Sequence, residues 1–269
     1  MPEWEFDGEI ARGASGRRAR LVQEWLALHD IQVAIDGKYG PATAQVVRQF
    51  QELRGLRPTG AVNRTTFDAL VEPMTEARVA ISAQGRSLGD LVIAYAKRHL
   101  AQRPREIGGQ NLGPWARLYT KGNEGPDYPW CAGFACFVLQ QACGCLARSA
   151  PLRPSFSCDL LATDAQKRAL FLPETRRRSP DDTPAGSFFL SRRVVGDWVH
   201  TGLVLSAGKD TFETIEGNTN DAGDREGYEV CRRVWGYNNK GFHRDELNCG
   251  SAGSRITGGS RYACSDSLL

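Results

Sequence analysis

The sequence lacks any long apolar segment. No stretch of its 269 residues approaches the roughly 18 consecutive apolar residues of a membrane-spanning helix. Its start also lacks the basic residues and apolar core of a secretory signal, because Glu3, Glu5 and Asp7 stand where positive charges would be needed. We therefore expect neither a membrane span nor a Sec signal.

Cysteine and histidine are too few and too scattered for a disulfide scaffold or a structural metal centre. The chain has 8 cysteines and 4 histidines. Cys143 and Cys145 have the wrong spacing for a zinc knuckle, and no second Cys or His pair completes one. We expect no metal and no cofactor.

Neither sign of charge dominates. Lys and Arg total 34 against 31 Asp and Glu, and the basic pairs are dispersed along the chain. No basic tract interleaved with aromatic residues is present, so nucleic acid is not an expected partner. Hydrophobic residues make up 41%, which is ordinary for a soluble globular protein.

Residues 16–72 have the pattern of a compact module of three helices. Apolar side chains recur at helical spacing in three segments, and Pro41 suits the first turn of the second helix. The loops at 37–43 and 60–66 resemble each other: each has a Gly, an apolar residue two places on and a Thr in the following first turn. This short internal repeat predicts a pseudo-symmetric module.

The module also carries a family motif. The pattern D-G-x-Y-G-P-x-T from Asp36, followed by G-L-x-x-T-G from Gly55, resembles the peptidoglycan-binding domain found on many wall hydrolases. The resemblance implies that a groove beside the loops holds a wall fragment. We accordingly expect peptidoglycan as the partner, with Asp36 and Tyr39 among the residues that contact it.

The composition of the chain indicates two domain boundaries after this module. Pro73, Gly85 and small polar residues indicate a linker over 73–87, and Ser87 with Asp90 forms a capping box that begins the next helix. A second domain is expected at 88–240. The Gly- and Ser-rich residues 241–269 are expected to be a tail without chemistry.

The segment around Cys131 carries the first candidate for chemistry. Pro129 turns the chain, and Phe134, Ala135 and Val138 then recur at helical spacing. Cys131 is therefore predicted in the first turn of a buried helix, where the helix dipole stabilises a thiolate and free N–H groups can bind an oxyanion. From this segment alone, a small buried apolar cysteine is an equal alternative.

A predicted hairpin supplies a base for such a nucleophile. His200 lies on a strand at 198–205, and Glu216 and Asn218 share a face of the returning strand. A Cys nucleophile needs a His base and a third group that orients the His. We favour Glu216 for that third position because a carboxylate stabilises an imidazolium better than an amide does; Asn218 is the alternative.

The other histidines fit this role poorly. None of the three has a strand partner with an acid at alternate spacing; they are His29, His99 and His243.

The catalytic segments resemble a known family. The stretches at 129–134, 200–204 and 215–219 are similar to the CHAP family of cysteine amidohydrolases, within the papain-like and NlpC/P60 group. The resemblance covers about residues 88–240. It implies an α+β fold in which a helical lobe packs on an antiparallel sheet, with Cys131 as nucleophile, His200 as base and Glu216 as orienting residue.

Further expectations follow from that resemblance. Asn218 would add polar support, and Tyr128 and Trp130 beside the nucleophile are expected to contact substrate. Many members bind calcium through an acidic loop before the Cys, but this chain has only Glu124 and Asp127 there. We therefore expect no metal.

The combined reading is a peptidoglycan hydrolase that is made in the cytoplasm and acts at the cell wall. The amide that it cuts could join muramic acid to L-alanine or lie within the stem peptide or bridge. It could be a phage endolysin released by a holin, an antibacterial effector countered by an immunity protein, or a housekeeping autolysin. A wall-binding protein with an inert second domain is the remaining alternative.

Overall fold

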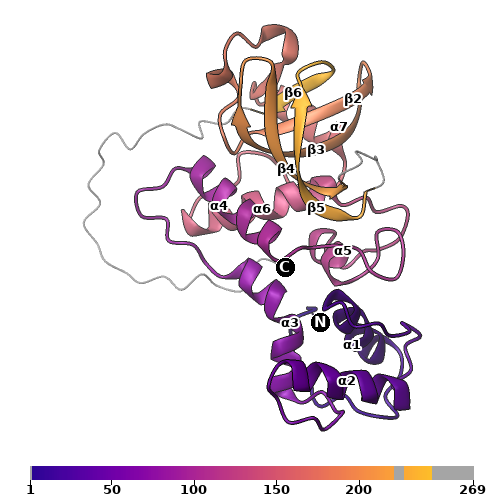
Figure 1. Ribbon diagram of the computed structural model, residues 1–269. Helices are drawn as coiled ribbons and strands as arrows, with labels where there is room; N and C mark the ends of the chain where they lie inside the picture. Colours follow the sequence, from indigo (N-terminus) through magenta and orange to yellow (C-terminus); the bar gives the residue numbers. More distant parts are fainter. Residues whose placement is uncertain (1, 221–226, 244–269) are drawn as a thin grey trace.

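Figure 1 shows the computed structural model, which describes residues 2–220 and 227–243. A helical module at the bottom of the view precedes a domain in which helices lie beneath an antiparallel sheet. The architecture is α+β, as the sequence predicts. Within the described residues, no helix combines the length and the apolar character that a membrane span requires.

The N-terminal module consists of α1 (Arg17–Leu28), α2 (Pro41–Leu53) and α3 (Arg64–Arg78). Pro41 occupies the first turn of α2, where its missing N–H costs nothing. Asn63 caps α3 by accepting a hydrogen bond from the backbone N–H of Thr66.

The predicted internal repeat is confirmed by two equivalent glutamines. Gln23 accepts a hydrogen bond from the N–H of Gly37 and donates to the hydroxyl of Thr43. Gln51 does the same in the second copy, where it accepts from the N–H of Gly60 and donates to the hydroxyl of Thr66. Each buried glutamine side chain therefore links a loop glycine to a threonine in the first turn of the helix that follows the loop. The two copies are pseudo-symmetric in this respect.

The predicted linker is shorter than expected. Helix α3 continues through Pro73 to Arg78, so the expected boundary at 73 was wrong. Met74 and Ala77, beyond the proline, are completely buried, and their packing maintains the last turn that Pro73 would otherwise disfavour. The predicted capping box is confirmed: Ser87 and Asp90 exchange hydrogen bonds at the start of α4 (Leu88–Ala101).

The second domain places helices against a six-stranded antiparallel sheet of order β1-β6-β2-β3-β4-β5. Helix α6 packs against β3, β4 and α4 and so joins the helical part to the sheet. The remaining helices are α5 (Pro114–Tyr119), α6 (Cys131–Cys145), α7 (Cys158–Lys167), η1 (Glu174–Arg176) and η2 (Pro180–Asp182). The strands are β1 (Phe171–Pro173), β2 (Phe188–Val194), β3 (Asp197–Ala207), β4 (Thr211–Thr219), β5 (Glu229–Gly236) and β6 (Lys240–His243).

The predicted end of the domain at 240 was also too early. Strand β6 pairs with both β1 and β2, so residues 241–243 belong to the sheet and not to a tail. His243 is buried there. The rest of the predicted tail, 244–269, lies outside the described residues.

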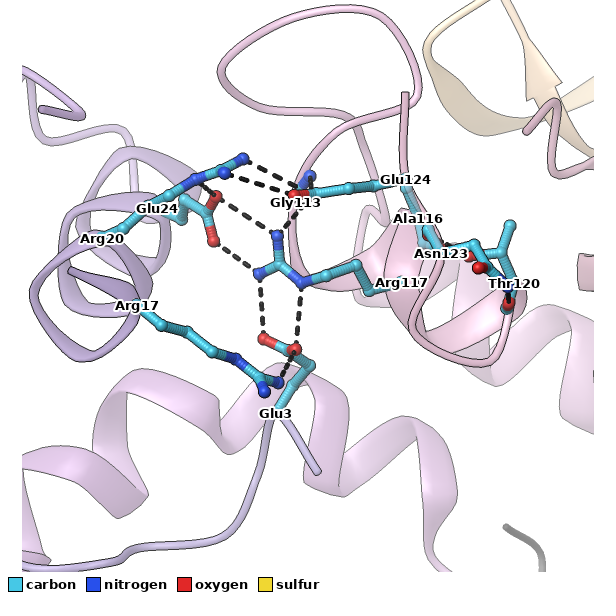
Figure 2. A network of polar contacts seen from close by, with 10 residues as sticks. All are labelled: Glu3, Arg17, Arg20, Glu24, Gly113, Ala116, Arg117, Thr120, Asn123 and Glu124. Atoms are coloured by element: carbon cyan, nitrogen blue, oxygen red, sulfur yellow. Dashed lines mark hydrogen bonds and ion pairs between the residues drawn. The ribbon is translucent and has the colours of Figure 1, made fainter. Parts of the chain in front are cut away.

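An ion network joins the module to the second domain (Figure 2). The guanidinium of Arg117 on α5 contacts both carboxylate oxygens of Glu3 at 2.9 Å. It also contacts Glu24 on α1 at 2.5 Å and Glu124 at 2.6 Å. Because Glu3, Glu24 and Arg117 are largely buried, this contact holds the two domains in a defined arrangement.

Two further contacts support the same interface. The rings of Trp25 and Trp115 meet edge to face with their centroids 6.3 Å apart. Arg105 donates to the backbone carbonyl of Leu28 at 2.9 Å, at the end of α1, and to the carboxylate of Asp30.

Candidate active site

Cys131 is the first residue of α6, which confirms its predicted position at a helix start. Its side chain is only 4% exposed. The first helical hydrogen bond runs from the N–H of Phe134 to the carbonyl of Trp130, so the N–H groups of the first turn have no partner within the helix. The thiol therefore lies at the positive end of α6, beside donors that could receive an oxyanion.

His200 on β3 and Glu216 on β4 form a buried pair. The Nε2 atom of His200 lies 2.7 Å from Oε2 of Glu216. The other carboxylate oxygen of Glu216 accepts hydrogen bonds from the Thr214 hydroxyl and from Nε1 of Trp235. With donors on both oxygens, the carboxylate is fixed in position and well suited to orient the imidazole.

The close approach of these strands depends on Gly202. A Cβ atom added there would lie 2.6 Å from Cγ of Glu216 and 2.9 Å from Cε1 of Phe189. Glycine at this position thus leaves the space that the Glu216 side chain occupies beside His200.

Cys131 and His200 interact directly, and each stabilises the charged form of the other. The pKa of Cys131 lies well below its usual range because of a hydrogen bond with Cys158 and, against the opposing effect of burial, because of its contact with His200. Burial lowers the pKa of His200, but its hydrogen bonds with Cys131 and Glu216 outweigh burial and raise it to about 10. Since Nε2 of His200 is hydrogen-bonded to Glu216, Nδ1 is the ring nitrogen that can interact with Cys131. The pair has the character of a thiolate and an imidazolium.

Cys158 is a residue of this site that the sequence reasoning missed. It is the first residue of α7, and its Sγ atom lies 3.9 Å from Sγ of Cys131. Its hydrogen bond with Cys131, together with burial, raises its pKa well above the usual value, so it remains a protonated thiol that can donate to the thiolate. The sequence did contain a signal for Cys158. Ser157 is a typical helix-capping residue, and it predicts a helix that begins at Cys158.

The start of α7 is tied to the strand that bears His200. Asp159 accepts a hydrogen bond from the backbone N–H of Trp198 on β3 at 2.8 Å. Trp198 precedes His200 by two residues, so this hydrogen bond helps to set the position of Cys158 relative to the histidine, together with the packing of α7 on β3.

Asn218 lies in the same region but does not contact His200 through a hydrogen bond found among the described residues. Its Oδ1 accepts from the backbone N–H of Trp130 at 2.6 Å, and its Nδ2 donates to the carbonyl of Gly227 at 2.7 Å. Its φ of 55° falls at an irregularity in the β4–β5 register. Asn218 therefore holds Trp130, the residue before Cys131, and Glu216 is the hydrogen-bond partner of His200.

Two residues expected to contact substrate are buried in the core instead. Trp130 is completely buried, stacks on Tyr119 and donates from Nε1 to Glu106 at 2.8 Å. Tyr39 is 2% exposed, and its hydroxyl donates to the carbonyl of Gly60. Both expectations were wrong, because these rings pack inside their domains and leave no face for a ligand.

The other two expected contact residues are accessible. Tyr128 is 39% exposed and precedes Cys131 by three residues. Asp36 is exposed, and one of its oxygens accepts from Nε2 of Gln23 and from the N–H of Lys38, both at 2.8 Å. These hydrogen bonds lower the pKa of Asp36, so its carboxylate is ionised.

The remaining histidines have other surroundings. His29 contacts the carbonyl of Leu70, and His99 lies between the Tyr119 hydroxyl and the Gln141 amide. Burial lowers the pKa of His99 and of His243 to about 4 in each case. Across residues 2–220 and 227–243, no three His, Cys, Asp or Glu side chains are grouped so that they could hold a metal ion.

Comparison with known proteins identifies the N-terminal module. Residues 15–70 match the family model described as a peptidoglycan binding domain. The chain thus has a peptidoglycan-binding domain at its N-terminus, as the motifs from Asp36 and Gly55 indicated.

Individual proteins are similar to parts of the chain. The zinc D-Ala-D-Ala carboxypeptidase of Streptomyces albus G is 33% identical over 72 residues, which are 26% of this chain and 28% of that protein. The chain thus spans less than a third of the length of this curated relative. The solved SleB N-terminal domain is 32% identical over 25% of this chain and 93% of its own, with a TM-score of 0.24. A fused Zn-dependent amidase/peptidase/peptidoglycan-binding domain-containing protein from Clostridium acetobutylicum is 14% identical over 85% of this chain and 61% of its own, with a TM-score of 0.23.

Proposed function

We propose that this protein is a peptidoglycan hydrolase that cleaves an amide bond with Cys131 as its nucleophile. The observation that carries the proposal is the convergence of three elements: Cys131 at the start of α6, His200 on β3 and Glu216 on β4. This is the arrangement that activates a thiol for acyl transfer. The resemblance of the same segments to the CHAP family supports it.

The first half of the reaction forms an acyl-enzyme. The Cys131 thiolate attacks the carbonyl carbon of the amide, and N–H groups of the first turn of α6 stabilise the oxyanion. The C–N bond then breaks as His200 gives its proton to the leaving amine. The product is a thioester between Cys131 and the acyl part of the wall fragment.

The second half restores the enzyme. His200, now neutral, takes a proton from water, and the hydroxide attacks the thioester carbonyl. Breaking the C–S bond releases a carboxylate and returns the thiolate. Glu216 holds the imidazole in one orientation and stabilises its charged form throughout both halves.

Two neighbouring residues position the nucleophile in this scheme. Cys158 donates its S–H to the thiolate, and Asn218 fixes the backbone of Trp130 immediately before it. Both act through Cys131 and its surroundings.

The N-terminal domain gives the reaction its location. A peptidoglycan-binding domain held rigidly against the catalytic domain keeps the active site at the wall, where the concentration of amide bonds is high. The same chemistry would serve a phage endolysin, an injected effector or an autolysin. A neighbouring holin gene would indicate the first, and a neighbouring immunity gene the second.

A zinc-dependent reaction is the second candidate, because the similar protein of Streptomyces albus G is named as a zinc carboxypeptidase. Lysis of purified sacculi by the full chain separates the two candidates. Iodoacetamide should abolish lysis by alkylating Cys131, and 1,10-phenanthroline should leave the rate unchanged. Loss of activity with the chelator and resistance to iodoacetamide would overturn the thiol mechanism.

A further inference from the structure

A groove of about 1520 Å³ runs between the peptidoglycan-binding domain and the catalytic domain. One wall is formed by the loop that carries the family motif, through Asp36, Gly37 and Lys38. The facing wall includes Lys121 after α5 and Phe156 before α7. The groove is therefore lined by both domains, and neither domain alone would form it.

The ion network that lines the groove fixes its width. Arg117 and the three carboxylates that it binds, from Glu3, Glu24 and Glu124, are themselves among the lining residues (Figure 2). A buried arginine that holds three segments of the chain resists separation of the walls. The groove is a preformed site, which lowers the cost of binding an extended ligand.

The groove also runs along α6, the helix that begins with Cys131. Gly133 and Cys136 line it and follow Cys131 on α6 by two and five residues, so at about 100° per residue they lie on the face of the helix opposite Cys131. Phe156, which is 38% exposed, also lines it and precedes Cys158 by two residues. The groove thus lies behind the helix whose first residue is Cys131 and extends to the loop of the binding domain.

The charges of the groove favour an anionic ligand. The carboxylates of Glu3, Glu24 and Glu124 are balanced by Arg17, Arg20 and Arg117, and the ionised Asp36 is held by Gln23 and the N–H of Lys38. By contrast, the exposed ammonium groups of Lys38 and Lys121 form no salt bridge within the described part of the chain. One such cation stands on each wall, so both domains offer positive charge to the same ligand.

We propose that this groove binds the carboxylate-bearing stem peptide of peptidoglycan, with Lys38 and Lys121 as the cations that hold it. The proposal rests on the proposed function, because it assigns the groove to the substrate of that reaction. The stem peptide is a short extended chain with free carboxylates, and it carries the amides that the active site would cut. The peptidoglycan-binding domain then contributes to recognition of the substrate as well as to attachment to the wall.

The test measures binding without catalysis. In the full chain carrying Cys131→Ala, the Kd of muramidase-released disaccharide-peptide fragments is compared for Lys38→Glu, Lys121→Glu and the control Lys97→Glu. Lys97 is exposed on α4 and does not line the groove. Each groove variant should weaken binding about tenfold, since a charge-assisted contact is replaced by repulsion, and the control should bind as before. Fragments with amidated carboxylates should lose affinity for the parent protein and discriminate less between the variants.

Two results would overturn the groove proposal: equal affinity of all three lysine variants, or unchanged binding of the amidated fragments. The proposed function is tested separately, with Cys131 intact. A protein that binds the fragments through Lys38 and Lys121 but hydrolyses no wall amide would contradict the proposed function and leave the groove assignment standing.

Discussion

The Sγ atom of Cys158 lies 3.9 Å from the Sγ atom of Cys131, and each cysteine is the first residue of its helix. The two helix starts are thereby brought together at one thiol pair. The pKa values of the two thiols move in opposite directions, with Cys131 as the thiolate and Cys158 as the donor. The Cys131 thiolate is thus stabilised by a neutral thiol as well as by His200.

Replacing Cys158 should make the thiolate harder to form. In Cys158→Ala the hydrogen bond is lost, so the acid limb of the pH profile for alkylation of Cys131 should move to higher pH. Cys158→Ser keeps a hydrogen-bond donor at the same place and should shift the acid limb of this profile less. Because the readout is the pH profile and not the overall rate, a loss of packing alone would not reproduce this order. Identical profiles for all three proteins would show that Cys158 has no role in activation.

Changing Glu216 should lower turnover by acting on His200. Glu216→Gln retains shape and hydrogen bonding but removes the charge that stabilises the imidazolium. We expect kcat to fall by about an order of magnitude or more. Since Glu216 raises the pKa of His200, its loss should move the basic limb of the pH–rate profile to lower pH. Asn218→Ala is the comparison and should leave the basic limb of the pH–rate profile unchanged. If Asn218→Ala shifted this limb and Glu216→Gln did not, Asn218 would be the residue that acts on His200.

Gly202 should tolerate no side chain. Gly202→Ala would place a Cβ atom 2.6 Å from Cγ of Glu216, so that either the carboxylate or the strand must shift. Overpacking of this kind costs about 1–3 kcal/mol and here should also reduce activity by displacing Glu216 from His200. Gly144→Ala, in α6 with open space around it, is the matched control and should keep full activity. Wild-type activity in Gly202→Ala would show that the Glu216 position is not critical.

Arg117 should be a main determinant of stability at the domain interface. Arg117→Ala leaves Glu3, Glu24 and Glu124 with only Arg17 and Arg20, which are more exposed, as partners, and breaking a buried pair costs up to about 3–5 kcal/mol. Urea unfolding of the full chain should show this loss. Arg193→Ala removes an exposed pair with Asp197 and should leave the unfolding midpoint nearly unchanged. Equal midpoints for the two variants would mean that the network contributes no net stability.

Local patterns predicted most of this architecture. The helix that starts at Cys131, the hairpin of His200 and Glu216 and the repeated loops of the module are set by residues close in sequence. Such patterns depend on backbone periodicity and capping, which a sequence expresses directly.

Features that depend on tertiary packing could not be obtained in this way. Cys158 reaches Cys131 only because α6 and α7 converge, and their helix starts lie 27 residues apart. Pro73 predicts the end of a helix, but α3 continues past it because Met74 and Ala77 are buried in the core. From sequence alone, an aromatic residue beside a motif could contact substrate or pack in the core. Trp130 packs in the core.

The most direct test of the thiol mechanism is the rate at which Cys131→Ala lyses purified sacculi. The variant removes only the sulfur atom at the start of α6 and leaves the His200–Glu216 pair in place. We expect lysis to be abolished while circular dichroism and co-sedimentation with sacculi stay as in the wild type. Lysis by Cys131→Ala at the wild-type rate would contradict the account.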